Sequence, residues 1–486
     1  MFNNISIELI KTFSAEEIKN FEEYIKCPLF NKRKELVKLY GLIIKCRPEF
    51  TSHDLKRENL FRKLYPETEY NEQTLRTRMT ELSSLIRGYF TLVYQQKNPL
   101  VNKTLQIKEL MARHKYSVSE KILKEALESL EKEKYENPKY FEYKYLLLSD
   151  LCLVYSAVEN YKERLNAEIK RAECFIDFFL TDFLSNAKDI ITLNVHNKVS
   201  KDSDVVRRFL ENFSMDPFLL YLKESDYEHY AVIAIYYYTY LTRKENDNEK
   251  HYYDLKEIVF SEYGKFSKKD QFKFWDFLSG AVYPVLVSRD RKFYDEKFQV
   301  DKFFSGLDAF LTINDKYMYA QTFNNVFAGA ALVNELEWAE EFILKNKNML
   351  LPEIRENTFN YCMAMLCSKK KEFERSLSYL GKIRFQELSY NLDVRMSYIM
   401  NYYELSIFDQ LFSSIDSFKH FISENNNLPE HRIDWAKTSL TFITKIANAK
   451  SGNKNLDYAE LKKAENTVTF MNRKWILEKM KELLDK

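Results

Sequence analysis

Apolar residues recur at helical spacing along most of the chain, and one early segment shows the pattern most clearly. Leu75, Met79, Leu82, Ile86 and Phe90 follow one another at intervals of four, three, four and four residues. This spacing places all five on one face of an α-helix. A second segment, residues 231–241 (AVIAIYYYTYL), is instead apolar on every side. We expect that helix to be central, with neighbours on several sides.

The first 96 residues predict five helices. Ser14 followed by Glu17 forms a capping box, in which each side chain accepts a hydrogen bond from the other residue's backbone N–H. Pro28, Pro48 and Pro66 fall between the helical segments, where proline ends a helix. The fifth helix is predicted to start near Asn71.

A third pattern recurs between residues 317 and 421, where a small residue is followed four positions later by a large apolar one. The pairs are Ala339 with Ile343, Ser376 with Leu380, and Ser414 with Phe418. The small residues are 37 and 38 positions apart (376 − 339 and 414 − 376), and an apolar helical segment precedes each of them. A small residue lets two helices approach closely, so each unit is predicted to be a helix pair. Helix pairs that repeat every few tens of residues are typical of an α-solenoid.

On these residues the segment resembles a tetratricopeptide-type repeat. If Ala339 takes the small position of the second helix, Phe323 takes the aromatic position of the first. Pro352 then lies near the inter-repeat proline, and Ala364 falls at a small position of the next unit. The units here are longer than the usual ~34 residues. The resemblance implies a protein-interaction scaffold, although repeat folds host many roles.

Composition favours an all-α chain of more than one domain. Only 8 Gly and 9 Pro occur in 486 residues, whereas sheet and nucleotide-binding folds need many tight turns. We predict an N-terminal helical domain at 1–136, an array of helix pairs at 137–316, and the tetratricopeptide-like repeats with a capping helix at 317–486. The N-terminal pattern at 9–17 and 61–66 also resembles uncharacterised all-helical bacterial proteins, and that resemblance implies no function.

The net charge is small, and the cysteine pattern is typical of a protein whose thiols stay reduced. The net charge is +2, but residues 1–116 hold 21 Lys/Arg and 14 Asp/Glu (+7), which leaves 53 and 58 (−5) for the remainder. None of the six cysteines forms a CxxC motif, so we interpret them as reduced core thiols. No secretion signal and no run of about 18 apolar residues is present. The predicted location is the cytoplasm, with no membrane partner.

A short helix (residues 55–64), a turn (65–70) and an Arg-bearing helix resemble a helix-turn-helix. Polar side chains at the start of the Arg-bearing helix are of the kinds that reach base edges: Asn71, Gln73, Thr74, Arg76 and Thr77. The candidate nucleic-acid contacts are Lys56, Arg57, Arg76 and Arg87. The alternative is a bundle with a solvated basic face, because Glu67, Glu69, Glu72 and Glu81 would repel phosphate.

Catalytic motifs are missing from the sequence. No phosphate-binding glycine loop, GxSxG elbow or HExxH occurs, and the seven histidines never pair at helical spacing. We therefore predict no catalytic, cofactor-binding or metal-binding residues. The leading prediction is a non-enzymatic helical-repeat scaffold that holds a protein or peptide partner in a groove. Two alternatives remain: a nucleic-acid-binding regulator, and an enzyme whose site is assembled from distant helices.

Overall fold

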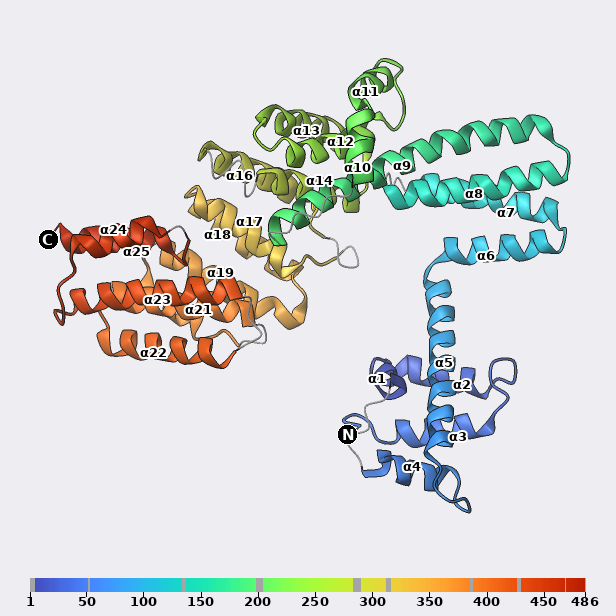
Figure 1. Cartoon of the computed structure of the whole chain (residues 1–486), viewed down its shortest axis with the longest axis horizontal. Helices are drawn as coiled ribbons and strands as arrows, with labels where there is room; N and C mark the ends of the chain where they lie inside the picture. Colours follow the sequence, from blue (N-terminus) through green and yellow to red (C-terminus); the bar gives the residue numbers. More distant parts are fainter. Residues whose placement is uncertain are drawn as a thin grey trace. The chain divides into compact units, whose positions relative to one another are not determined.

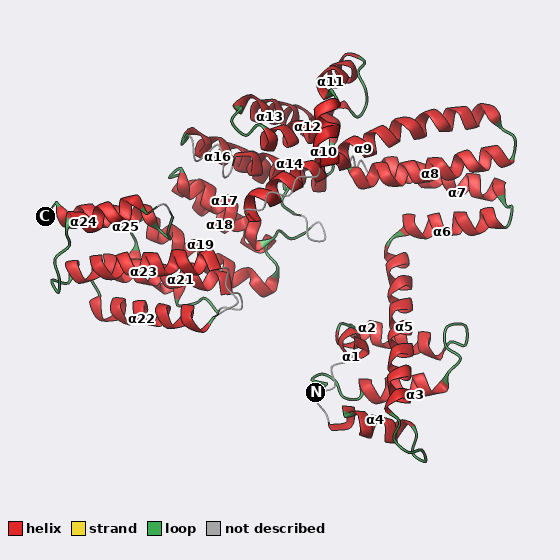
Figure 2. Cartoon of the chain, viewed as in Figure 1, coloured by secondary structure: helices red, strands yellow, loops and turns green. Residues whose placement is uncertain are grey.

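The chain is all-α, as predicted. The computed structural model describes residues 5–50, 53–132, 137–197, 204–282, 290–311, 316–384, 388–425, 430–467 and 469–485. Within these ranges it has 24 α-helices and a single isolated bridge, between Met318 and Leu350, in place of a sheet (Figure 2). In the same ranges, none of the helices combines the length and the apolarity that crossing a membrane requires.

Two compact units make up the chain. The first comprises residues 1–132 and 143–172, and the second comprises 133–142 and 173–486. Helices α8 (Pro138–Ala157) and α9 (Tyr161–Asn197) therefore contribute residues to both units. The boundary predicted at residue 136 lies outside the described residues, and the division predicted at 316 stays a prediction.

Helix α5 organises the N-terminal part of the first unit (Figure 1). It contacts each of the four helices before it, and its predicted stripe is buried from Leu75 to Ile86, with Phe90 half-buried. Gly88 leaves room for the Tyr24 side chain, because a Cβ atom there would lie 2.7 Å from the hydroxyl of Tyr24. The helices of this unit, besides α8 and α9, are α1 (Ile5–Lys11), α2 (Ala15–Lys26), α3 (Lys34–Ile44), α4 (Arg57–Leu64), α5 (Glu72–Lys97), α6 (Pro99–Ala112) and α7 (Tyr116–Lys132).

Two helix starts predicted in this region are confirmed. Glu17 N–H donates to Ser14 Oγ at 3.1 Å, and Ser14 N–H donates to Glu17 Oε2 at 2.9 Å. These two bonds form the predicted capping box of α2. Asn71 caps α5, where its Oδ1 accepts from the N–H of Thr74 at 2.9 Å.

The second unit begins around a buried helix. Within α12, all of whose residues are described, eleven of fifteen are buried, and the helix contacts α11, α13 and α14. The prediction of a central helix is confirmed. The helices of this region are α10 (Asp204–Asn212), α11 (Met215–Glu224), α12 (Tyr230–Lys244), α13 (Glu249–Glu262), α14 (Lys268–Ala281) and α16 (Lys292–Ser305).

From α17 to α23, each helix packs on the next one along the chain. Ala339 and Ser376 are fully buried, as the repeated pattern predicts, whereas Ser414 is only half-buried. The Ser376 hydroxyl donates to the Ala364 carbonyl at 2.8 Å and accepts from Asn401 Nδ2 at 2.9 Å, so it joins three helices. These helices are α17 (Ala320–Leu332), α18 (Leu336–Asn346), α19 (Pro352–Lys369), α20 (Phe373–Leu380), α21 (Leu388–Glu404) and α22 (Phe408–Glu424).

The last three helices are α23 (Glu430–Lys450), α24 (Tyr458–Asn466) and α25 (Arg473–Leu484). They share one apolar core with α21 and α22, in which Phe418, Ile443 and Ile476 are fully buried. The Trp475 indole N–H donates to Glu404 Oε1 at 2.7 Å and so fixes α25 to α21.

Candidate functional site

A pocket of about 710 Å³ opens between α22, α23 and α24, and we call it the C-terminal pocket. Buried Ile422 and Leu440 contribute apolar surface, together with half-buried Leu456. Its volume is typical of small-ligand and peptide-side-chain sites. The remaining lining residues are polar: Lys419, Ser423, Lys437, Thr441, Thr444, Lys445, Asn448, Lys454, Asn455, Asp457 and Glu460.

The connection between α23 and α24 closes one side of this pocket. Gly452 has a φ of +77°, which only glycine adopts without strain, and this residue turns the chain out of α23. The next backbone N–H, at Asn453, donates back to the Asn448 carbonyl at 2.9 Å. Asp457 then caps α24 by accepting from the N–H of Glu460 at 2.9 Å. The turn and the cap together hold residues 454–457 against α23.

The charges of the C-terminal pocket are unbalanced. Of the described residues that line it, four are lysines and two carry carboxylates. Glu460 pairs with Lys445, and Asp457 is held in its cap. Lys437 and Lys454 form no ion pair with any residue in the described part of the chain.

The four predicted nucleic-acid contacts, Lys56, Arg57, Arg76 and Arg87, lie elsewhere, in the first unit, and all four are exposed. Arg76 Nη2 lies 2.9 Å from Oε1 of Glu72, and Arg57 pairs with the same oxygen. The structure therefore brings these two arginines together on one carboxylate. Lys56 precedes Arg57, while Arg87 is eleven residues beyond Arg76 (87 − 76), about 16 Å further along α5.

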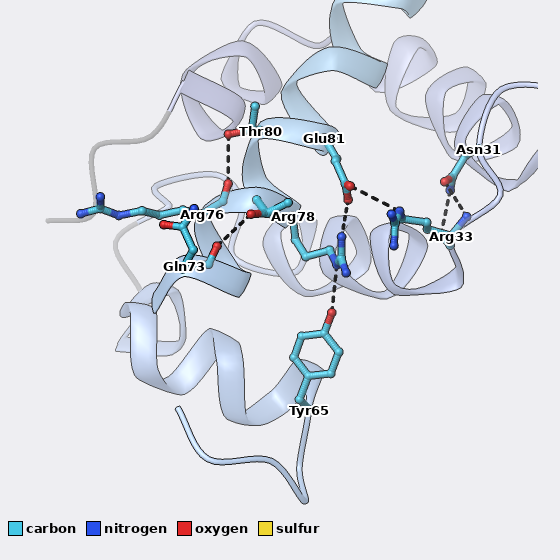
Figure 3. A network of polar contacts seen from close by, with 9 residues as sticks. Asn31, Arg33, Tyr65, Gln73, Arg76, Arg78, Thr80 and Glu81 are labelled. Carbon is cyan, nitrogen blue, oxygen red and sulfur yellow. Dashed lines mark hydrogen bonds and ion pairs between the residues drawn. The ribbon is translucent and has the colours of Figure 1, made fainter. Parts of the chain in front are cut away.

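A second ion-pair network surrounds Glu81, one of the glutamates expected to repel phosphate (Figure 3). Arg78 Nη1 lies 2.7 Å from Glu81 Oε2, and Arg33 Nε lies 3.3 Å from the other carboxylate oxygen. The Nε–H of Arg78 also donates to the Tyr65 hydroxyl at 3.1 Å. Its hydrogen bonds with Tyr65 and Glu81 raise the pKa of Arg78. Arg76 points away from this network.

Among the described residues, the most deeply buried carboxylate is that of Asp301 on α16. Burial raises its pKa, which its neighbours partly oppose: the Trp275 indole N–H donates to Oδ1 at 2.8 Å, and Lys297 donates to Oδ2. Both oxygens thus have donors that join α14 and α16, so we interpret Asp301 as a packing residue. Among the described residues, no group of three or more His, Cys, Asp or Glu side chains is placed to hold a metal ion.

Sequence reasoning missed the C-terminal pocket and its lysines. On α23, Lys437, Thr441, Thr444 and Asn448 follow helical spacing opposite the apolar face, a pattern that ordinarily marks a solvated surface. Lys454 lies in the connection between α23 and α24. A weak signal did exist, because this polar face carries lysines, hydroxyls and amides but has no carboxylate of its own between residues 435 and 456.

Comparison with family models and with curated proteins finds no match to this chain.

Proposed function

We propose that this chain is a helical-repeat scaffold that holds a segment of a partner polypeptide. Helices α17 to α25 would stack as successive pairs, each contributing surface beside the next, as in other repeat proteins. The burial of Ala339 and Ser376 at the predicted crossings supports this arrangement. So does the hydroxyl of Ser376, which connects α20 to both α19 and α21.

The observation that carries the proposal is the C-terminal pocket. Three helices and a capped connection form its walls, so its shape does not depend on one exposed loop. It combines apolar surface at Ile422 and Leu440 with polar groups at its rim. Side-chain pockets on helical scaffolds recognise peptides through this combination of an apolar anchor and polar contacts.

Site-specific crosslinking tests the proposal. The photo-crosslinker p-benzoylphenylalanine replaces Thr441, which lines the pocket and is exposed. The matched control places it at Lys462, which is exposed on α24 and lies outside the lining. After irradiation in the cell, we expect a discrete polypeptide adduct from position 441 and none of that mass from position 462. Equal adducts at the two positions, or none at 441, would contradict the proposal.

A second candidate function is binding of duplex nucleic acid through α5. Gln73, Arg76, Thr77 and Thr80 are exposed at i, i+3, i+4 and i+7 on the first turns of this helix. That spacing sets them side by side, and their side chains include those that contact base edges and phosphates. The pairing of Glu72 with two arginines and of Glu81 with Arg33 and Arg78 weakens the expected repulsion.

Fluorescence anisotropy with a labelled DNA duplex tests this second candidate. If α5 binds, affinity falls steeply with salt, because each phosphate that the protein neutralises releases about 0.9 of a counterion. The double variant Arg76→Ala, Arg87→Ala then flattens the slope by about one unit for each phosphate that is no longer neutralised. Absence of salt-sensitive binding by the unaltered chain removes this candidate.

A further inference from the structure

We infer that the C-terminal pocket takes an acidic segment of a partner polypeptide, whose carboxylates meet the pocket's lysines and whose apolar side chain covers its floor. This inference rests on the proposed function and names the chemistry of the partner. Charge, hydrogen bonding and apolar surface each favour this occupant.

The two carboxylates in the described lining are both already engaged within the chain. Glu460 is engaged with Lys445, and Asp457 accepts the cap bond of α24. Among the described residues, Lys419 pairs only with Asp416, where the two side chains are 51% and 71% exposed, so that contact exchanges readily with solvent. Lys437 and Lys454 have no acidic partner among the described residues. The pocket thus presents positive charge on two of its sides, on α23 and on the connection to α24.

The hydroxyl groups of the lining favour a polypeptide over other anions. The hydroxyls of Ser423, Thr441 and Thr444 donate to carbonyls of their own helices at 2.7–2.9 Å. Since a hydroxyl has one proton, these three groups face the pocket as acceptors. Acceptors match the backbone N–H groups of a peptide. They offer nothing to a phosphate ester, whose oxygens at neutral pH are themselves acceptors.

The apolar surface of the pocket adds a requirement for an apolar side chain in the ligand. Ile422 and Leu440 line the pocket at only 4% and 2% exposure, so half-buried Leu456 and the apolar stems of the lysines supply further apolar surface around them. An apolar side chain of the ligand would extend this packing and remove water from it. A ligand of carboxylates alone would leave that surface wet. The expected segment therefore has at least one apolar residue flanked by Asp or Glu.

Selection from a random peptide library tests the inference. Peptides displayed on phage are selected on the full chain, synthesised with a fluorescent label, and titrated by anisotropy. We expect the recovered sequences to be enriched in Asp and Glu beside an apolar residue. Their affinity should fall about tenfold or more in the double variant Lys437→Glu, Lys454→Glu. The matched control, Lys462→Glu with Lys463→Glu, changes net charge equally at exposed positions outside the pocket and should leave affinity within about twofold.

Three outcomes overturn the inference. The first is a set of selected peptides without acidic enrichment, and the second is an equal decrease of affinity in the two double variants. The third is complete displacement of the peptide by inorganic tripolyphosphate at the peptide's own concentration, which would assign the site to phosphate anions. Crosslinking from position 441 separates these failures from failure of the scaffold itself. A polypeptide adduct there without acidic selectivity retains the scaffold and rejects only the acidic partner.

Discussion

The exposed cations of α4 and α5 differ from those of the C-terminal pocket in what already surrounds them. Arg57 and Arg76 share the carboxylate of Glu72, while Lys437 and Lys454 have no such neighbour among the described residues. Both sets consist of exposed basic side chains, and nothing in the sequence alone tells them apart. A partner would therefore meet Lys437 and Lys454 without a competing carboxylate, whereas at Arg57 and Arg76 it would have to replace Glu72.

The pocket keeps its walls only if the helices of the second unit stay packed. The largest expected effect on the free energy of unfolding is therefore at a helix crossing. Ala339→Phe should lower the free energy of unfolding by about 1–3 kcal/mol or more, because a large ring is forced into a fully buried crossing. Tryptophan fluorescence in a urea titration measures it, since all four tryptophans lie in the second unit. Ser414→Phe, at the corresponding half-buried position, should cost less. An unchanged midpoint for Ala339→Phe would show that the repeat alignment is wrong.

An engaged cation should matter for stability. Arg78→Ala removes the hydrogen bond to Tyr65 and one of the two partners of Glu81, and the Arg78 side chain is only 17% exposed. We expect a decrease of about 1–2 kcal/mol in the free energy of unfolding, visible by circular dichroism as a lower urea midpoint of the first unit. Tryptophan fluorescence should not change, because the first unit contains no tryptophan. A variant as stable as the parent would show that the network in Figure 3 contributes nothing.

A paired but exposed cation should matter less. Arg76→Ala breaks one ion pair with Glu72, where the arginine side chain is 62% exposed. The expected cost is about 0.3–0.5 kcal/mol at low salt, and it should vanish as salt is raised. The same circular dichroism titration, repeated at two ionic strengths, provides the measurement. A salt-independent cost would mean that Arg76 acts through packing instead of charge.

The smallest effect on stability is expected for substitution of a lysine in the pocket. Lys437→Ala removes no ion pair with a described residue, so the free energy of unfolding should stay within about 0.5 kcal/mol of the parent at any ionic strength. Peptide affinity should nevertheless decrease, which separates a binding role from a structural one. A large decrease of stability in this variant would place Lys437 with the engaged cations and end the contrast.

Local sequence signals were sufficient for much of the fold. The capping box at Ser14, the cap at Asn71 and the stripe from Leu75 to Ile86 each depend on residues within a few turns of one another, and the structure has them as expected. Ser414 is half-buried although it shares the pattern of Ala339 and Ser376, because burial depends on which later helices cover the position. Spacing alone does not contain that information.

The C-terminal pocket could not be predicted from the local sequence for a related reason. Lys437 and Lys454 line the same pocket because the chain turns at Gly452 and the connection that follows closes one side of it, before the cap at Asp457. The predicted arginines were found because arginine at helical spacing is visible in a sequence, whereas their partner Glu72 was interpreted only as a repelling charge. Whether two charged side chains form an ion pair depends on which residues the fold brings close to each other.

Helix α12 has a consequence for the timescale on which the second unit opens. Its amide protons reach solvent only when the helices around it separate, because eleven of its fifteen residues are buried and α11, α13 and α14 contact it. Exposed helices such as α24 lose protection by local fraying, which needs far less free energy. In heavy water, the amides of α12 should therefore be among the last of this unit to exchange, at a rate set by its cooperative opening.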